Sequence, residues 1–396
     1  MKKRLLVALS MVLVFSLLIG CSSNSGNSGG TSTSGSSGSG ADTIKVGVNY
    51  ELTGAVASYG VDLNDGLQMA LEEINDAGGI LGKELEIMTM DNKSSDTESA
   101  NVSARLARDG AVVLLGPATS GNTKAAIPAA NENKIPLISA SATADDITLD
   151  AQGNVRPYIF KTCFSDSFQG VMMAEFALND LAGKNAAILA DSTSDYAQGL
   201  SKAFIETFEA GGGTILGTEA YQAKETDFRA VLTNIKALNP EILFVPGYYE
   251  ETGLIVKQAR ELGIEAPILG ADGYEAPKFS ELAGEANDVY YSSHYSPNDT
   301  AENVVNFNTA FEAKYSKQPN AFNALGYDLG YFFKDALERA GEVDSEKLKA
   351  ALEETDGFEG VTGVVSIDEF HNPVKSITIN QVVNGETEFL KKLDPK

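Results

Sequence analysis

Strand-like and helix-like segments alternate along most of this chain. Short apolar runs at residues 43–49, 84–90 and 111–115 are separated by longer segments, such as residues 61–76, in which apolar residues recur every three or four positions. Parallel strands need a crossover connection, and a helix is the usual one. The alternation therefore predicts an α/β fold with mostly parallel sheets and helices on both faces.

The alternation begins again near residue 162, which indicates a second lobe built like the first. We expect two Rossmann-like lobes, one formed by residues 42–161 plus 294–375 and the other by residues 162–293 plus 376–396. Such a division requires several crossings of the chain between the lobes, and these crossings are natural hinges. Two lobes that face each other by the carboxyl ends of their strands would enclose a ligand cleft.

Residues 1–20 are typical of a secretory signal peptide, because three positive residues precede an apolar run that is short for a membrane span. The run ends in Leu-Ile-Gly-Cys, which resembles the bacterial lipobox, in which Cys21 would receive a diacylglyceryl group after cleavage. An ordinary signal peptide with a chance cysteine is the alternative. Residues 21–41 form a flexible Ser/Gly tether. The sequence thus predicts a body anchored by lipid to an outer membrane face.

The charge of the chain argues against nucleic acid as a partner. Removal of the signal peptide leaves 27 Lys and Arg against 55 Asp and Glu, so the formal charge moves from −25 to −28. A surface of this sign repels phosphate backbones and anionic lipid. We therefore exclude DNA binding, although ligand domains of repressors share the predicted fold.

The sequence offers little material for an enzyme or a metal site. Cys163 lies in a strand-like run and reads as a buried small hydrophobe, with only His294 and His371 in the whole chain to activate it. Two isolated histidines argue against a zinc site. The single Gly-x-Ser-x-Gly match, at residues 26–30, lies in the tether and lacks the strand-turn-helix context of a nucleophile. We expect no enzymatic activity and no cofactor.

Two corners that follow neighbouring strands carry small hydroxyl residues. Ser120 opens a helix after the strand at residues 111–115, and Ser141, Ala142 and Thr143 follow the strand at residues 135–139. A helix start has backbone N–H groups without intrahelical partners and favours an anion such as a carboxylate. Helix capping is the alternative role for Ser120 and Thr143. Together the two corners predict a site for a small anionic ligand.

The order and spacing of several short motifs resemble the leucine/isoleucine/valine-binding protein family. The motifs are Leu52-Thr53-Gly54 with Ser58-Tyr59-Gly60, the run Glu-Ile-Asn-Asp-Ala-Gly-Gly-Ile at residues 73–80, Gly116-Pro117 with Ser120, Ile138-Ser139 with Ala142-Thr143, Gln169-Gly170, Asp195-Tyr196 with Gly199, and Gly247-Tyr248. The resemblance covers the body from about residue 44 onward. It implies the type I periplasmic-binding fold and an extracytoplasmic solute receptor of an ATP-driven amino-acid importer.

The resemblance also implies which residues hold the ligand. Hydroxyls and amides at Ser120, at Ser141 and Ala142, and at Thr143 would hold the α-carboxylate. Asp272, at a position often occupied by glutamate, would hold the α-ammonium, directly or through a water. The aromatic residues that close over the ligand would be Tyr196 and Tyr248, with Tyr59 at the edge of the side-chain pocket. Turn formation by Asp272 and packing at the rim by the tyrosines are the structural alternatives.

An amino-acid receptor of this kind implies a set of partners. They are a branched-chain or other aliphatic amino acid, the permease subunits of an ABC importer, and the membrane through lipid on Cys21; we expect a monomer. The alternatives are the same fold binding an amide, urea or aromatic carboxylate, and a sensory receptor role. Because those ligands lack an ammonium group, the role of Asp272 separates the first two hypotheses.

Overall fold

The computed structural model describes residues 43–393, so the expected signal peptide and the whole tether, including Cys21, lie outside the described residues. Between residues 43 and 393, no helix has both the length and the apolar character that crossing a lipid bilayer requires.

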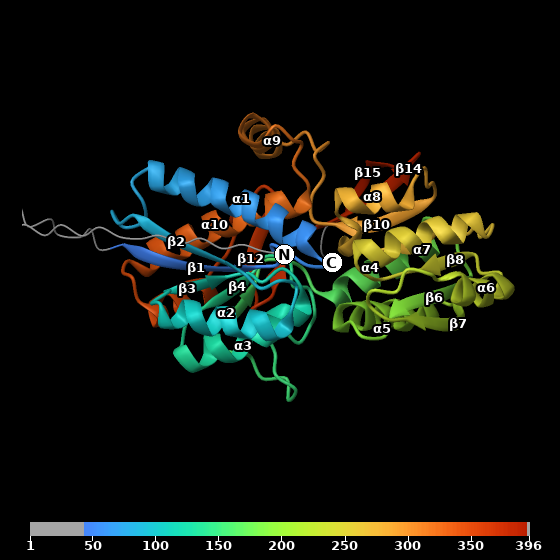
Figure 1. Cartoon of the computed structure of the whole chain (residues 1–396), viewed down its shortest axis with the longest axis horizontal. Coiled ribbons are helices and arrows are strands. Elements are labelled where there is room, and N and C mark those ends of the chain that lie inside the picture. Colours follow the sequence, from blue (N-terminus) through green and yellow to red (C-terminus); the bar gives the residue numbers. More distant parts are fainter. Residues whose placement is uncertain (1–42, 394–396) are drawn as a thin grey trace, which may run out of the picture. The chain divides into compact units, whose positions relative to one another are not determined.

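Five parallel strands form the first sheet, in the order β2-β1-β3-β4-β5 (Figure 1). Its strands are β1 (Ile44–Tyr50), β2 (Leu85–Asp91), β3 (Val113–Leu115), β4 (Leu137–Ser139) and β5 (Ile159–Lys161). The helices that accompany it are α1 (Ala57–Asp76), α2 (Asp96–Arg108), α3 (Ser120–Asn133), α9 (Glu302–Tyr315), α10 (Ala321–Ala340) and α11 (Ser345–Glu353). Val46 and Val48 on β1 are fully buried, as expected for a strand covered on both faces. We call the sheet and these helices the first lobe.

Seven strands form the second sheet, in the order β15-β14-β10-β9-β8-β6-β7. Its strands are β6 (Asn185–Asp191), β7 (Thr214–Tyr221), β8 (Ile242–Phe244), β9 (Ile268–Gly270), β10 (Val289–Ser293), β14 (Ile377–Val383) and β15 (Glu386–Leu393). Its helices are α4 (Asp166–Asn179), α5 (Asp195–Ala210), α6 (Arg229–Leu238), α7 (Tyr249–Glu261) and α8 (Pro277–Ala283), with a 3-10 turn, η1 (Asp272–Tyr274). In this second lobe β14 is antiparallel to both its neighbours. The predicted α/β fold with mostly parallel sheets is confirmed.

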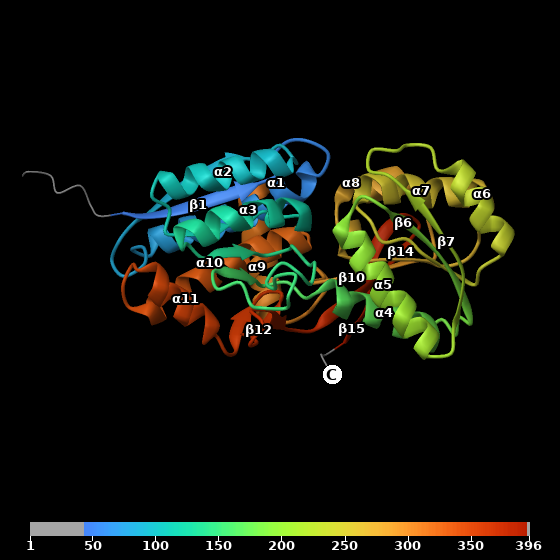
Figure 2. The ribbon, with the colours of Figure 1, turned by 90° about the horizontal axis from the view of Figure 1, so that it is seen from below.

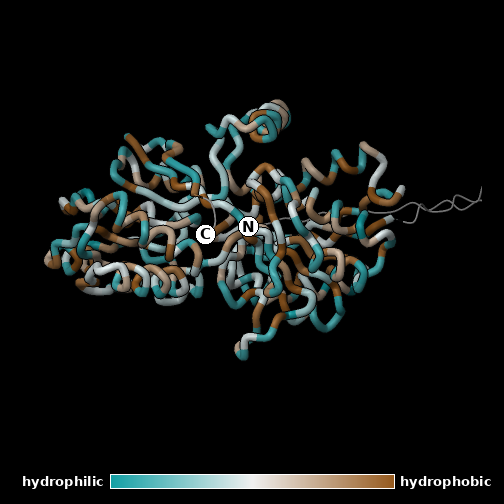
Figure 3. The backbone as a smooth tube through the Cα atoms, turned by 180° about the vertical axis from the view of Figure 1, so that it is seen from behind, coloured by the Kyte–Doolittle hydropathy of each residue, from teal (hydrophilic) through white to brown (hydrophobic). Residues whose placement is uncertain are grey.

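The chain passes three times between the two sheets within residues 43–393. It leaves the first lobe after β5, returns after β10, and leaves again after a small sheet of β11 (Phe358–Gly360), β12 (Gly363–Ile367) and β13 (Pro373–Val374). Figure 2 shows these connections between the two groups of helices. Hydrophobic and hydrophilic residues alternate along the helices in Figure 3, as expected where each helix buries one face.

Close packing of α1 against α10 brings two aromatic residues together at the edge of the first lobe. A Cβ on Gly66 would lie 1.9 Å from the carbonyl oxygen of Asn323, and one on Gly326 would lie 2.0 Å from that of Leu63. Glycine is therefore required at both positions. The first turns of the two helices carry Tyr59 and Phe322, whose ring centroids are 4.7 Å apart.

The start of α3 is held by a buried carboxylate from the end of β1. Glu51 accepts hydrogen bonds from the backbone N–H groups of Ala118 and Thr119, at 3.0 and 3.1 Å. It also accepts from the hydroxyl of Thr119 at 3.0 Å and from the side-chain amide of Asn122 at 2.7 Å. Negative charge is favourable at a helix N-terminus. Glu51 therefore ties β1 to the corner that precedes α3.

We expect Glu51→Gln to lower the free energy of unfolding by about 2 kcal/mol or more, because an amide N–H₂ would face donors that now bond to a carboxylate. Urea denaturation followed by circular dichroism measures this loss. Glu132→Gln, at an exposed position of the same helix, is the control and should change stability by less than about 0.5 kcal/mol. Equal effects of the two substitutions would contradict the assigned role.

A second buried carboxyl group, that of Glu275, contacts both lobes. The hydroxyl of Ser293 donates to its Oε2 at 3.0 Å, and the backbone N–H of Ala321, at the start of α10, lies 3.4 Å from its Oε1. Burial raises the pKa of Glu275 to about 7, although these hydrogen bonds lower it. The folded protein therefore retains this proton at a pH where an unfolded glutamate is ionised.

Because the pKa of Glu275 is higher in the folded than in the unfolded chain, its contribution to stability is complete below about pH 4.5 and is lost as the pH rises through about 7. Glu275→Gln keeps the side chain neutral, so the variant should lose less stability than the wild type between pH 5 and pH 7.5. Urea denaturation at both pH values tests this, with exposed Glu281→Gln as the control. An unchanged pH dependence in Glu275→Gln would refute the assignment.

Candidate functional site

A small cavity lies where residues from the strand ends of the two lobes meet. Its empty space, part of which is open to solvent, is about 250 Å³. Its lining residues are Tyr59, Ala118, Thr119, Ser120, Ser141, Thr143, Tyr196, Tyr248, Asp272, Gly273 and Phe322. Seven of the eight residues proposed from the sequence as ligand contacts are thus brought together around one cavity. Ala142 does not line it.

The two corners of the first lobe are bonded to each other beside the cavity. The hydroxyl of Ser120 accepts a hydrogen bond from the backbone N–H of Ala144 at 3.1 Å. The hydroxyl of Ser141 donates to the carbonyl oxygen of Ala118 at 2.8 Å. The N–H of Ala142 donates to the hydroxyl of Ser139 at 3.0 Å, and its side chain is fully buried. Ala142 therefore supports the corner, and its N–H already has a partner.

The first turn of α3 offers further N–H groups beside this corner. Glu51 already occupies the N–H groups of Ala118 and Thr119. The N–H groups of the first helical residues, Ser120 and Gly121, have no partner within an α-helix. These N–H groups and the hydroxyls of the cavity-lining residues Ser120 and Thr143 are of the kind that can bind an anion.

The opposite side of the cavity carries the carboxylate of Asp272, which stands on η1 directly after β9. The hydroxyl of Tyr196 donates to its Oδ1 at 2.7 Å, and Nε2 of His294 lies 3.2 Å from its Oδ2. The backbone N–H of Asp272 donates to Oε1 of Gln169 at 3.2 Å. With only 4% of the residue exposed, Asp272 is a buried acid whose two oxygens each contact a different side chain, Tyr196 of the second lobe and His294 just after β10.

Aromatic rings form the remaining wall of the cavity. Tyr196 and Tyr248 stack with centroids 5.1 Å apart and an interplanar angle of 10°. Tyr59, from the first lobe, meets the edge of Tyr248 at 5.7 Å. Burial raises the pKa of each of these three tyrosines well above its usual value, so all are neutral hydrogen-bonding groups.

Several contacts close one lobe on the other. The hydroxyl of Tyr59 donates to the carbonyl oxygen of Gly273 at 2.5 Å. The ammonium group of Lys124 on α3 lies 2.7 Å from the carboxylate of Asp195 on α5. A wider hollow of about 910 Å³ adjoins the cavity and shares Thr119, Tyr196 and Tyr248 with it. The structure is therefore a closed arrangement with the cavity behind a wider mouth.

Sequence reasoning gave no site role to Asp166, Gln169 or His294. Burial raises the pKa of Asp166 well above its usual value, although contact with the side chain of Thr143 lowers it, and apart from this contact neither carboxylate oxygen has a hydrogen-bond partner within the described part of the chain. Asp166 and Gln169 lie in the first turn of α4, and His294 directly follows β10. The rule that ligands gather at the carboxyl ends of strands also applies to the end of β10, so His294 could have been found from the sequence.

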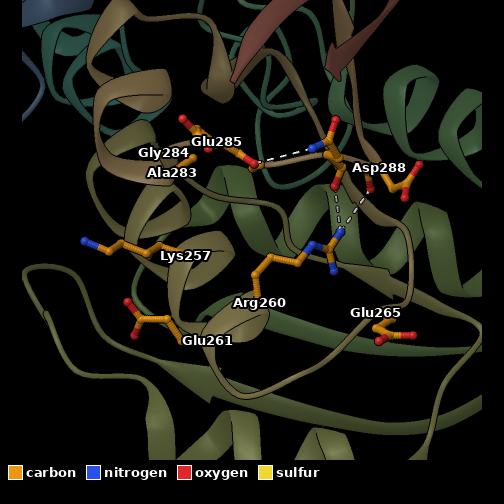
Figure 4. A pocket seen from close by; sticks show the side chains of 10 residues that line it. Lys257, Arg260, Glu261, Glu265, Ala283, Gly284, Glu285 and Asp288 are labelled. Carbon is orange, nitrogen blue, oxygen red and sulfur yellow. Dashed lines mark hydrogen bonds between the residues drawn. The ribbon is translucent and has the colours of Figure 1, made fainter. Parts of the chain in front are cut away.

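A wide surface hollow lies elsewhere on the second lobe and has a structural explanation (Figure 4). It holds about 1150 Å³ of space that is open to solvent. The guanidinium of Arg260 at its centre donates to the carbonyl oxygens of Ile264, Ala266, Asn287 and Asp288 at 2.7 to 3.3 Å. Since these bonds join the loops that precede β9 and β10, Arg260 holds the sheet together at this end.

The chain is similar to known proteins over most of its length. A family model described as periplasmic binding protein matches residues 43–387. The chain is 30% identical over 332 residues to the Leu/Ile/Val-binding protein BraC3 of Rhizobium johnstonii, which covers 82% of this chain and 88% of that protein. It is 29% identical to the leucine-, isoleucine-, valine-, threonine- and alanine-binding protein of Pseudomonas aeruginosa, over 83% of this chain and 87% of that protein.

Two solved structures are similar over most of the chain. One is the branched-chain amino acid transporter substrate-binding protein LivJ of Streptococcus pneumoniae in complex with isoleucine, with a TM-score of 0.84 and 39% identity, covering 89% of this chain and 100% of that chain. The other is the leucine-binding protein LivK of Thermotoga maritima, with a TM-score of 0.84 and 34% identity, covering 89% of this chain and 99% of that chain.

We expect Cys163 to be unreactive in the folded protein. It is fully buried, and burial raises the pKa of its thiol to about 12, so the reactive thiolate is scarce at neutral pH. In a chain carrying Cys21→Ser, a chromogenic thiol reagent at pH 8 should label Cys163 slowly in buffer and completely in denaturant. Rapid labelling of the native protein would reopen a nucleophilic role for this residue.

Proposed function

Because this chain belongs to the leucine/isoleucine/valine-binding family of periplasmic binding proteins, we propose that it binds a branched-chain or other aliphatic amino acid between its two lobes. The observation that carries the proposal is the placement of hydrogen-bond donors on one side and of a carboxylate on the other side of one cavity. Helix-start N–H groups and hydroxyls at Ser120 and Thr143 face the cavity from the first lobe, and the carboxylate of Asp272 lines it from the second.

Each end of a zwitterion has a matching group in this site. The α-carboxylate would accept hydrogen bonds from the first turn of α3 and from the hydroxyls of Ser120, Ser141 and Thr143. The α-ammonium would lie against Asp272 in a charge-assisted contact. Tyr196 and Tyr248 would cover the ligand, and Tyr59 would border the side-chain pocket. A ligand with both charges would stabilise the closed conformation, because it bonds to both lobes at once.

The family assigns the protein a place outside the cytoplasm and a binding rather than a catalytic task. We propose that residues 42–161 plus 294–375 move against residues 162–293 plus 376–396, and that the closed protein delivers its ligand to ABC permease subunits as a monomer. Lipid on Cys21, after removal of residues 1–20, would hold it at the outer face of the membrane through the tether of residues 21–41. We propose that the protein has no enzymatic activity.

Asp272→Asn should weaken binding of leucine about 10- to 100-fold, because it removes a charge-assisted bond worth roughly 1.5 to 3 kcal/mol. Isothermal titration calorimetry with leucine measures this, and Asp227→Asn, a similar change at an exposed site of the second lobe, is the control. A screen with 4-methylpentanoate, which is leucine without its amino group, completes the test. Equal binding of both compounds by the wild type would favour an uncharged or purely anionic ligand.

A further inference from the structure

We propose that His294 is a positioning residue that orients the carboxylate of Asp272 toward the ligand ammonium, a role that rests on the function proposed above. His294 is the first residue after β10, on the second crossing between the lobes. Its side chain is 1% exposed, and its Nε2 lies 3.2 Å from Oδ2 of Asp272. The other oxygen of Asp272 accepts from Tyr196, so each oxygen has its own partner.

The surroundings of His294 determine which ring nitrogen carries its proton. Burial, and to a smaller extent the charge of nearby Lys375, lower the pKa of His294, whereas Asp272 raises it. The net effect is a pKa of about 4. The ring is therefore neutral at pH 7, with a single N–H. A proton on Nε2 makes this nitrogen a donor to Asp272. In the other tautomer, Nε2 and Oδ2 of Asp272 would both be acceptors and would repel each other. The proton would then lie on Nδ1, which is buried and has no partner within residues 43–393.

Stacking holds the imidazole ring in the orientation that this hydrogen bond needs. The ring lies against Phe164 with centroids 3.6 Å apart and an interplanar angle of 13°. Phe164 stands on the first crossing, between β5 and α4, whereas His294 stands on the second. Two segments that are distant in the sequence therefore fix the direction of Nε2, and this fixes the second oxygen of Asp272.

Neutral donors at both oxygens orient Asp272 without cancelling its charge. A cation in the place of His294 would form an ion pair with Asp272 and would compete with the ligand ammonium. A neutral imidazole and a neutral phenol instead leave the full negative charge for the ligand. Preorganisation of this kind lowers the entropy that is lost when a ligand binds. His294 should therefore affect recognition of the ammonium more than recognition of the rest of the ligand.

Two substitutions separate positioning from packing. His294→Leu removes the donor, and we expect it to weaken leucine binding about 5- to 15-fold, while any weak binding of 4-methylpentanoate changes less than about two-fold. His294→Gln places an amide N–H near the former Nε2 and should restore leucine affinity to within about three-fold of the wild type. Calorimetry with both compounds measures these ratios, and melting curves identify any variant that fails to fold.

The protonation state of His294 in the wild-type protein provides a second measurement, for which a variant is needed only to assign the signal. The chain contains two histidines, so ¹⁵N-edited NMR of the imidazoles can be assigned by the signal missing in His294→Gln or, failing that, in a substitution of His371. We expect a neutral His294 with its proton on Nε2 at pH 7. A charged ring or a proton on Nδ1 would overturn the proposal.

The calorimetric outcomes distinguish this proposal from the one on which it rests. If Asp272→Asn leaves leucine affinity unchanged, the ammonium site itself is wrong. If Asp272→Asn weakens binding but His294→Leu weakens leucine and 4-methylpentanoate by the same factor, His294 only packs, and the positioning role is refuted. Failure of His294→Gln to recover any affinity lost by a folded His294→Leu refutes it as well.

Discussion

The closed arrangement of this protein depends on a buried carboxylate that has no cationic partner among residues 43–393. Asp272 is 4% exposed, and its side-chain partners are a phenol and an imidazole that is neutral at pH 7. Removing a charge from water costs several kcal/mol unless an opposite charge or good hydrogen bonds offset that cost. Two neutral donors offset only part of it. An ammonium group in the cavity would supply the rest, so the electrostatics of the closed form favour an occupied site over an empty one.

On the opposite side of the cavity, the backbone N–H groups at the start of α3 fall into two sets, one bonded within the protein and one available to a ligand. Glu51 satisfies the N–H groups of Ala118 and Thr119 and fixes the corner, while the N–H groups of Ser120 and Gly121 remain for an incoming anion. A buried carboxylate beside an anion site weakens the attraction at long range. The four hydrogen bonds to Glu51 spread its charge over donors on the corner. Glu51 therefore makes the corner rigid, but it also weakens the electrostatic attraction of the site for an anion.

Local sequence patterns predicted the strands, the helices and the corners, because each depends on residues that are close in the chain. The rule that ligands gather at strand ends points to Ser120 and Thr143, the family resemblance points to Asp272, and these three residues do line one cavity. The same reasoning missed Glu51, whose partner Ala118 is 67 positions away, and the stacking of His294 on Phe164. Ala142 fits the corner motif, but its N–H bonds to Ser139. Periodicity contains no information about such pairs, since the fold alone brings them together.

The crossings between the lobes are bonded directly to residues of the binding site. On the first crossing, the buried ammonium of Lys161, at the end of β5, donates to the carbonyl oxygens of Thr143 and Ala144, each at 3.3 Å, and so supports the anion-binding corner. On the second crossing, His294 contacts Asp272 on the cation-binding side. Each end of the cavity is thus bonded to a different crossing. A rotation of the lobes that changes the backbone of either crossing must also move a group that supports the ligand, so lobe geometry and ligand contact cannot vary independently. Opening of the lobes would then weaken both ends of the site together. A protein that captures its ligand in one conformation and releases it in another requires this coupling between opening and ligand contact.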